Sequence, residues 1–124
     1  MKVSRARFER LAESALRGIP QMFRGLIVNL EISVQGLPGP EAGRWQGSRN
    51  LLGLYKGLPR ADMATPLSEA HPPARIILYQ RNIEAICPDE AELGRRVQLT
   101  LRHELAHHFG FTDEDLKRRW PEGA

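Results

Sequence analysis

Three side chains near the end of the chain have the types and the spacing of a metal-dependent hydrolytic site. Residues 103–107 read His-Glu-Leu-Ala-His, so two histidines stand four residues apart. On an α-helix such residues lie one turn apart on the same side, and the imidazoles of His103 and His107 can converge on one ion. Two neutral imidazoles and a third ligand suit Zn²⁺ and leave a position for a water whose pKa falls to about 7. Glu104 lies beside them, which predicts that it takes the proton of that water as general base.

The residues after this motif offer a third ligand. Gly110 lets the chain reverse, and Asp113 can return its carboxylate to the ion in the pattern His-Glu-x-x-His-x-x-Gly-x-x-Asp. Glu114 and Asp115 are alternative ligands. Thr112 or Asp113 can instead cap a terminal helix, and one aspartate does not easily do both.

A long helix has to carry the motif, and the pattern predicts one between Asp89 and Gly110. Asp89 can accept from the first free amides, and Glu92 can answer it in a capping box. Gly110 ends the helix as a C-terminal cap. His108 lies about 100° around the helix from His107, so it is a poor simultaneous ligand, and a role toward substrate and a structural role both stay open. Apolar residues at four-residue steps form a stripe that we expect to face the core, namely Leu93, Val97, Leu101 and Leu105.

The rest of the chain predicts an amphipathic helix and a small sheet that pack against the long helix. Helical spacing of apolar residues indicates a helix over 4–17, with Ser4 as its N-cap and Gly18 ending it in a left-handed turn. Pro20 can begin a second short helix over 20–25. Three strands are expected: a half-buried one over 27–34, a short one over 51–57 and a fully buried one over 75–79.

Segments rich in glycine and proline separate these elements. Residues 35–50 are expected to form a long exposed loop, and a second loop runs through Pro59, Pro66, Pro72 and Pro73. Trp45 either anchors the first loop onto the body or lies near a substrate cleft, and packing favours the anchor. His71, in the second loop, is expected to be solvated rather than a ligand. The terminal helix is expected over 113–120.

The composition is that of one ordinary globular domain. With 124 residues, 41% of them hydrophobic and 27% charged, we expect a single α+β domain over 1–124. The one cysteine, Cys87, excludes an internal disulfide and a zinc site built of thiolates, and we expect it to be buried. Because no secretory signal or bilayer-spanning stretch is found, we expect a cytoplasmic protein with no membrane partner. The 18 Lys and Arg are interspersed with 15 Asp and Glu, which argues against nucleic acid as a partner.

The segment HELAHHFGFTDEDL, preceded by RIILYQRNIEAICPDEAELGRRVQLTLR, resembles a family of small bacterial zincin-like metallopeptidases. The resemblance covers nearly the whole chain, since RFERLAESALRGIPQMF and LLGLYKGLP also fit the layout of that family. It implies a minimal α+β zincin-like fold, in which a mixed sheet of about three to four strands packs against an N-terminal helix and the long active-site helix. It also implies a Zn²⁺-dependent peptidase acting on a peptide or protein, with His103, His107 and Asp113 as ligands and Glu104 as general base.

The chain departs from larger zincins in one respect, and two other functions compete with the peptidase. Met1, Met22 and Met63 all precede the long helix, so the methionine turn that follows the third ligand in larger zincins is missing. Candidates for stabilising an oxyanion are Tyr79, Arg102 and His108. The first alternative is a non-catalytic zinc-binding module that regulates or binds another protein. The second is a basic nucleic-acid-binding domain, ranked last because no recognition motif is found.

Overall fold

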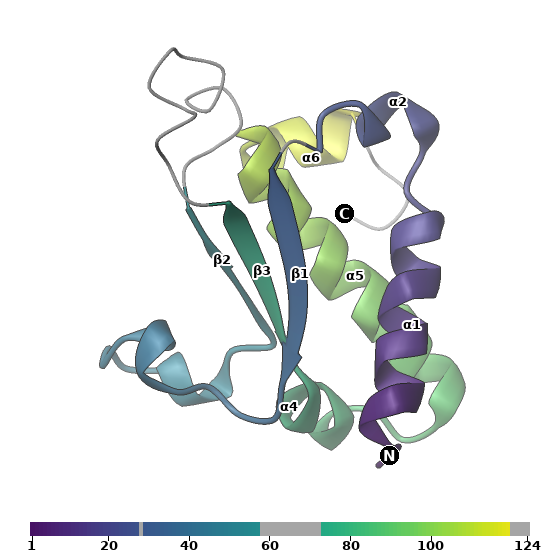
Figure 1. Cartoon of the computed structure of the whole chain (residues 1–124), viewed down its shortest axis with the longest axis vertical. Coiled ribbons are helices and arrows are strands. Elements are labelled where there is room, and N and C mark those ends of the chain that lie inside the picture. Colours follow the sequence, from purple (N-terminus) through teal and green to yellow (C-terminus); the bar gives the residue numbers. More distant parts are fainter. Residues whose placement is uncertain (28, 58–72, 120–124) are drawn as a thin grey trace.

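A three-stranded mixed sheet with helices on one face forms the centre of the molecule (Figure 1). The structure is a computed structural model that describes residues 1–27, 29–57 and 73–119, apart from the side chains of Asp113, Leu116 and Arg119. The strand order is β1-β3-β2, with β3 parallel to β1 and antiparallel to β2. The strands are β1 (Leu30–Gln35), β2 (Gly53–Lys56) and β3 (Ala74–Tyr79). The predicted α+β class with a small mixed sheet is confirmed.

The helices connect and cover these strands. Helix α5 packs against β2 and β3, and α1 packs against α5. The two short 3-10 turns η1 (Pro40–Ala42) and η2 (Ser48–Asn50) lie in the connection between β1 and β2. The α-helices are α1 (Arg5–Arg17), α2 (Gln21–Arg24), α4 (Gln80–Ala85), α5 (Glu90–Phe109) and α6 (Asp113–Arg119). The pattern analysis missed α4 and the two 3-10 turns.

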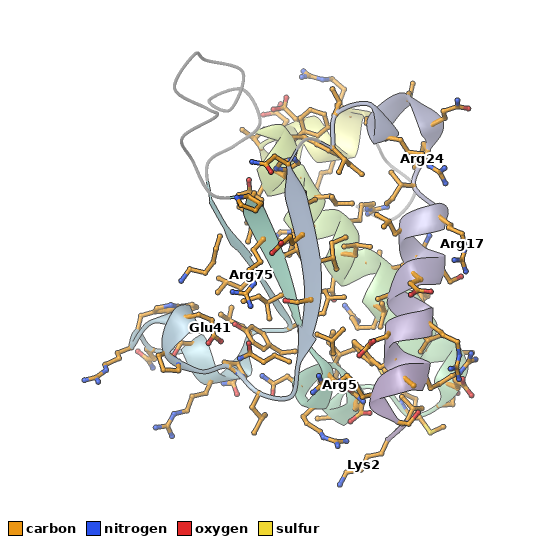
Figure 2. All side chains as sticks on the ribbon, viewed as in Figure 1. Lys2, Arg5, Arg17, Arg24, Glu41 and Arg75 are labelled. Carbon is orange, nitrogen blue, oxygen red and sulfur yellow. The ribbon has the colours of Figure 1, made fainter. Side chains whose placement is uncertain are left out.

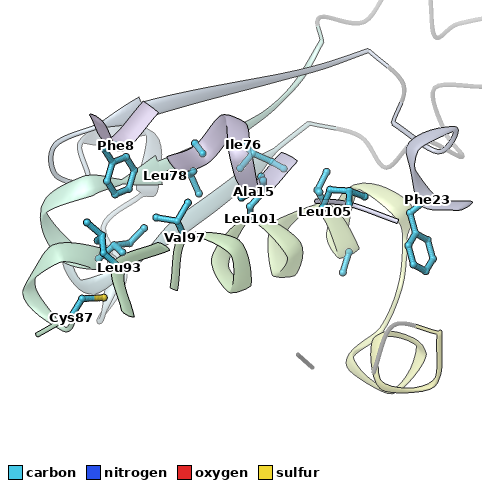
Figure 3. Close-up of a cluster of buried hydrophobic side chains, with 14 of the residues drawn as sticks. Phe8, Ala15, Phe23, Ile76, Leu78, Cys87, Leu93, Val97, Leu101 and Leu105 are labelled. Atoms are coloured by element: carbon cyan, nitrogen blue, oxygen red, sulfur yellow. The ribbon is translucent and has the colours of Figure 1, made fainter. Parts of the chain in front are cut away.

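The hydrophobic core lies between α5, α1 and the sheet (Figure 3). All four residues of the predicted stripe on α5 are fully buried, and they meet Phe8 of α1 and Ile76 and Leu78 of β3. β3 is buried on both faces, as its continuous apolar run predicts. Cys87 is also buried, as expected. Each buried leucine of the stripe contributes about 1.5–3 kcal/mol, so this stripe fixes how α5 lies on the sheet.

The predicted helix ends are right at three positions and wrong at a fourth. Ser4 Oγ accepts from the Arg7 amide at 3.0 Å, and Asp89 Oδ1 accepts from the Glu92 amide at 2.8 Å. Gly110 ends α5 in the left-handed region, with φ +77°. Gly18 was expected to do the same after α1, but its φ is −79°. The backbone stays in the right-handed helical region at Gly18, because the Ile19 amide still donates to a carbonyl of α1 and the Ile19 side chain is buried in the core.

Strand β1 begins later than predicted. The amides of Leu26 and Ile27 donate to carbonyls of Phe23 and Arg24, so these residues continue the turn after α2. Asn29 then takes a left-handed conformation, with φ +52°, and extended backbone starts only at Leu30. Apolar alternation does not reveal this turn, because Leu26 and Ile27 pack against the core as strand residues would. The expected positions of His71 and of residue 120 lie outside the described residues.

Glu41, rather than Trp45, fastens the loop between β1 and β2 to the sheet. Trp45 is 55% exposed, and its Nε1 donates to the Ala42 carbonyl at 2.8 Å within its own loop. The Glu41 carboxylate accepts from Tyr79 Oη at 2.8 Å, from Gln35 Nε2 at 3.0 Å and from the Gly39 amide at 2.7 Å. In Figure 2 Glu41 lies on the side of the sheet opposite to α1. The loop is therefore held on the face of the sheet that α1 and α5 leave uncovered.

Candidate metal centre

His103 and His107 lie side by side in the last two turns of α5. This end of α5 lies next to α6 (Figure 1). The centroids of the two imidazole rings are 4.9 Å apart, and both side chains are exposed. Glu104 follows His103 in sequence but is only 7% exposed. His107 Nδ1 is 3.5 Å from Glu104 Oε1. The helix therefore places two solvent-accessible imidazoles next to one buried carboxylate.

The Glu104 carboxylate is held under strand β2. The backbone N–H of Tyr55 donates a hydrogen bond to it. Burial, the largest influence, raises the pKa of Glu104, while the neighbouring His107 and His103 and the bond from Tyr55 lower it. The net direction is upward, which makes the carboxylate a stronger proton acceptor than a solvated glutamate. This is the property that a general base near neutral pH requires.

His108 takes a structural position. It is fully buried, and its Nδ1 lies 2.9 Å from Tyr55 Oη. The Tyr55 ring also meets the His107 ring edge-on, with centroids 6.5 Å apart. Burial keeps His108 away from the exposed face on which His103 and His107 meet. Sequence reasoning missed Tyr55, because nothing in LLGLYKG indicates which residues of the strand face α5.

The turn after α5 places the start of α6 close to the motif. Thr112 Oγ1 accepts from the Asp115 amide at 3.0 Å, and Asp115 Oδ2 accepts from the Thr112 amide at 3.0 Å. Arg118 donates to the other oxygen of Asp115 at 2.7 Å. Thr112 is therefore the N-cap of α6, and Asp113 is the first residue of the helix. Asp113 does not have to cap the helix, and the Asp115 carboxylate already has two partners.

The side chain of Asp113, the residue predicted as the third ligand, lies outside the described residues. Among the side chains that are described, no third His, Cys, Asp or Glu completes a metal-binding group with the two histidines. Glu114 is exposed on α6. The donor set fits zinc, because neutral imidazole nitrogens at one-turn spacing are ligands that this ion prefers.

The three candidate oxyanion stabilisers all lie in the interior. Tyr79 and His108 are fully buried and Arg102 is 4% exposed. The Tyr79 hydroxyl donates to Glu41, and burial, followed by that carboxylate, raises its pKa. None of the three lies on the exposed face that His103 and His107 form.

Comparison with known proteins agrees with this fold. The profile of a family described as zincin-like metallopeptidases matches residues 27–121, which include the whole sheet, α5 and α6. The chain belongs to the zincin-like metallopeptidase family. This membership supports hydrolase and zinc chemistry at the level of the family.

One solved structure with a similar fold is a conserved hypothetical protein from T. thermophilus. It is 24% identical, with a TM-score of 0.53, over 94% of this chain and 99% of that protein. This likeness bears on the fold alone. A search of curated proteins finds no match. Within the described residues, no helix has the length and the apolar character needed to cross a bilayer.

Proposed function

We propose that this protein is a zinc-dependent metallopeptidase, with His103, His107 and Asp113 as the metal ligands and Glu104 as the general base. The observation that carries the proposal is the pair of exposed imidazoles, 4.9 Å apart, beside a buried carboxylate with a raised pKa. The capping of α6 by Thr112 supports Asp113, because it leaves that aspartate without a capping role. When bound, zinc supplies an acidified water and polarises the scissile carbonyl.

The residues of this chain divide the remaining tasks. Glu104 accepts the proton of the attacking water and delivers it to the leaving amine, which balances the proton over the hydrolysis. Within the described sheet β2 is an edge strand beside the motif, so an extended peptide can lie along it and across the two histidines without using the Tyr55 amide, which already donates to Glu104. The proposed substrate is a peptide or protein, in line with the family to which the chain belongs.

A non-catalytic zinc-binding module is the competing function. It is favoured by one observation: Tyr79, Arg102 and His108, the candidates for stabilising an oxyanion, are all buried. Peptide hydrolysis gains about 2.7–4 kcal/mol from each such donor, so a site without one has a weaker basis for catalysis. The two functions share the metal site and differ in what Glu104 does.

The first experiment is the metal content of protein purified without chelator. We expect near-stoichiometric zinc in the native chain and its loss in His103→Ala. Gln98→Ala, an exposed change on the same helix, is the matched control and should keep its zinc. A native chain that binds no zinc even when zinc is added contradicts the proposal.

Glu104→Gln then separates the two functions. For a peptidase we expect zinc to remain while turnover of a peptide library falls by at least about 100-fold. Turnover that survives in this variant contradicts the role of Glu104. Zinc binding without turnover in the native chain favours the non-catalytic module.

A further inference from the structure

Strand β2 lies close to helix α5 at Gly53. A Cβ atom built on Gly53 would lie 2.9 Å from Thr100 Cγ2, 3.2 Å from Glu104 Cγ and 3.3 Å from the Ile77 carbonyl oxygen. The first of these distances is shorter than real Cβ contacts. Gly53 is not among the glycines with positive φ, so space rather than backbone conformation requires glycine here. Any side chain at this position requires the strand or the side chains of Thr100 and Glu104 to shift.

The hydrogen-bond pairing of β2 with β3 determines that the Tyr55 amide points toward Glu104. The Tyr79 amide donates to the Leu52 carbonyl at 2.9 Å, and Gly53 pairs with Leu78 further along the same register. In an antiparallel pair the bonded positions alternate, so the amides of Gly53 and Tyr55 point away from β3. The Tyr55 amide then donates to the Glu104 carboxylate. This bond depends on the same close approach that Gly53 permits.

Tyr55 also ties β2 to α5 through its side chain. Its hydroxyl is 2.9 Å from Nδ1 of the buried His108, and its ring lies edge-on to His107. One strand residue therefore contacts three residues of α5, Glu104 through its amide, His107 through its ring and His108 through its hydroxyl. The strand has little freedom to shift without moving the carboxylate.

We propose that Gly53 is a positioning residue for the general base. Its missing side chain lets β2 lie close enough to α5 for the Tyr55 amide to hold the Glu104 carboxylate beside the two histidines. The inference deepens the proposed function and rests on the assignment of Glu104 as the base. Its test therefore uses a readout that needs neither metal nor turnover.

Amide hydrogen exchange of metal-free protein, followed by NMR, measures the bond directly. In Gly53→Ala we expect the Tyr55 amide to exchange at least about tenfold faster, as for the loss of one hydrogen bond to a charged group. Leu54, paired with Ile77 of β3, is the internal control and should change much less. Gly36→Ala is the matched variant, because a Cβ there meets nothing within 4 Å. It should leave Tyr55 unchanged.

Two further variants separate positioning from packing. Glu104→Ala keeps Gly53 and should accelerate exchange at Tyr55 to the same extent; continued protection overturns the inference. Gly53→Ala with Thr100→Ser removes the nearest clash but keeps the 3.2 Å contact with Glu104 Cγ, so we expect stability to recover while the displaced carboxylate leaves Tyr55 unprotected. Recovery of both would mean that Gly53 serves only the packing at Thr100, which also overturns the inference.

Kinetics complete the test once turnover of the native chain is established. Gly53→Ala should lower kcat by at least about tenfold, with KM and zinc content unchanged, because the metal ligands stay in place. An unchanged kcat contradicts the inference even if the peptidase is real. A native chain without turnover contradicts the proposed function. The hydrogen-exchange experiment then tests the role of Gly53 in holding the Glu104 carboxylate independently of catalysis.

Discussion

Neighbouring residues of the motif have opposite exposures because the helix turns by about 100° per residue. His103 and His107 face solvent, Glu104 turns under β2, and His108 turns into the core. Two imidazoles accessible to an ion and one carboxylate protected from water thus come from five residues of one helix. His108, the third histidine of this segment, is not at the exposed face, because its ring nitrogen hydrogen-bonds to the Tyr55 hydroxyl.

Asp113 is the proposed ligand on α6, and its contribution to zinc binding can be measured separately. We expect Asp113→Ala to weaken zinc binding by on the order of 100-fold, since even partners of metal ligands contribute 10–100-fold. Competition with a chelator of known affinity measures the change. Glu114→Ala, on the next residue of α6, should have little effect. The reverse pattern would make Glu114 the ligand.

At the scale of elements, a single carboxylate holds the loop between β1 and β2. The hydrogen bond from the Gly39 amide is the largest cause that lowers the pKa of Glu41, from 4.5 to about 2, although burial opposes it. The loop leads directly into β2, whose Gly53 and Tyr55 contact the motif. Fixing the loop therefore also helps to fix the strand above the candidate site.

Replacing Glu41 by Gln should destabilise the fold in a pH-dependent way. Because the folded pKa is below the unfolded one, the carboxylate stabilises the fold fully above about pH 4.5, and this contribution is lost as the pH falls through about 2. We expect a loss of about 1–2 kcal/mol at pH 7. Urea unfolding of both proteins between pH 7 and pH 2 measures it. A difference that stays constant over this range would show that the ionised carboxylate is not what holds the loop.

At the scale of the whole molecule, one core carries all the elements around the motif. The cluster of buried residues includes side chains of α1, α2, β3 and α5. Phe111, in the turn between α5 and α6, packs against Phe109 and Phe23 with ring centroids 5.5 and 6.1 Å apart. The start of α6 is thus tied to the core. A metal ion bound by residues of both α5 and α6 would add a second link between these two helices.

Zinc should therefore stabilise the folded state. At a free concentration of about 100 times Kd, binding adds about 2.7 kcal/mol to the free energy of unfolding. For a domain of this size the melting temperature rises by roughly 10 °C. Thermal unfolding with zinc and with excess chelator measures the shift, and His107→Ala should abolish it. An equal shift in that variant would place the ion elsewhere.

Local patterns in the sequence were sufficient to predict the long helix and the motif that it carries. The spacing of His103, Glu104 and His107, the stripe from Leu93 to Leu105 and the caps at Asp89 and Gly110 are properties of one helix, and helical geometry follows from nearby residues. The groups that contact this helix from other segments became known only from the folded structure. The space left by Gly53, the amide of Tyr55 over Glu104 and the anchor from Glu41 to Tyr79 join segments far apart in the chain. No local pattern encodes such contacts, because strand register and sheet order set them once the core has packed.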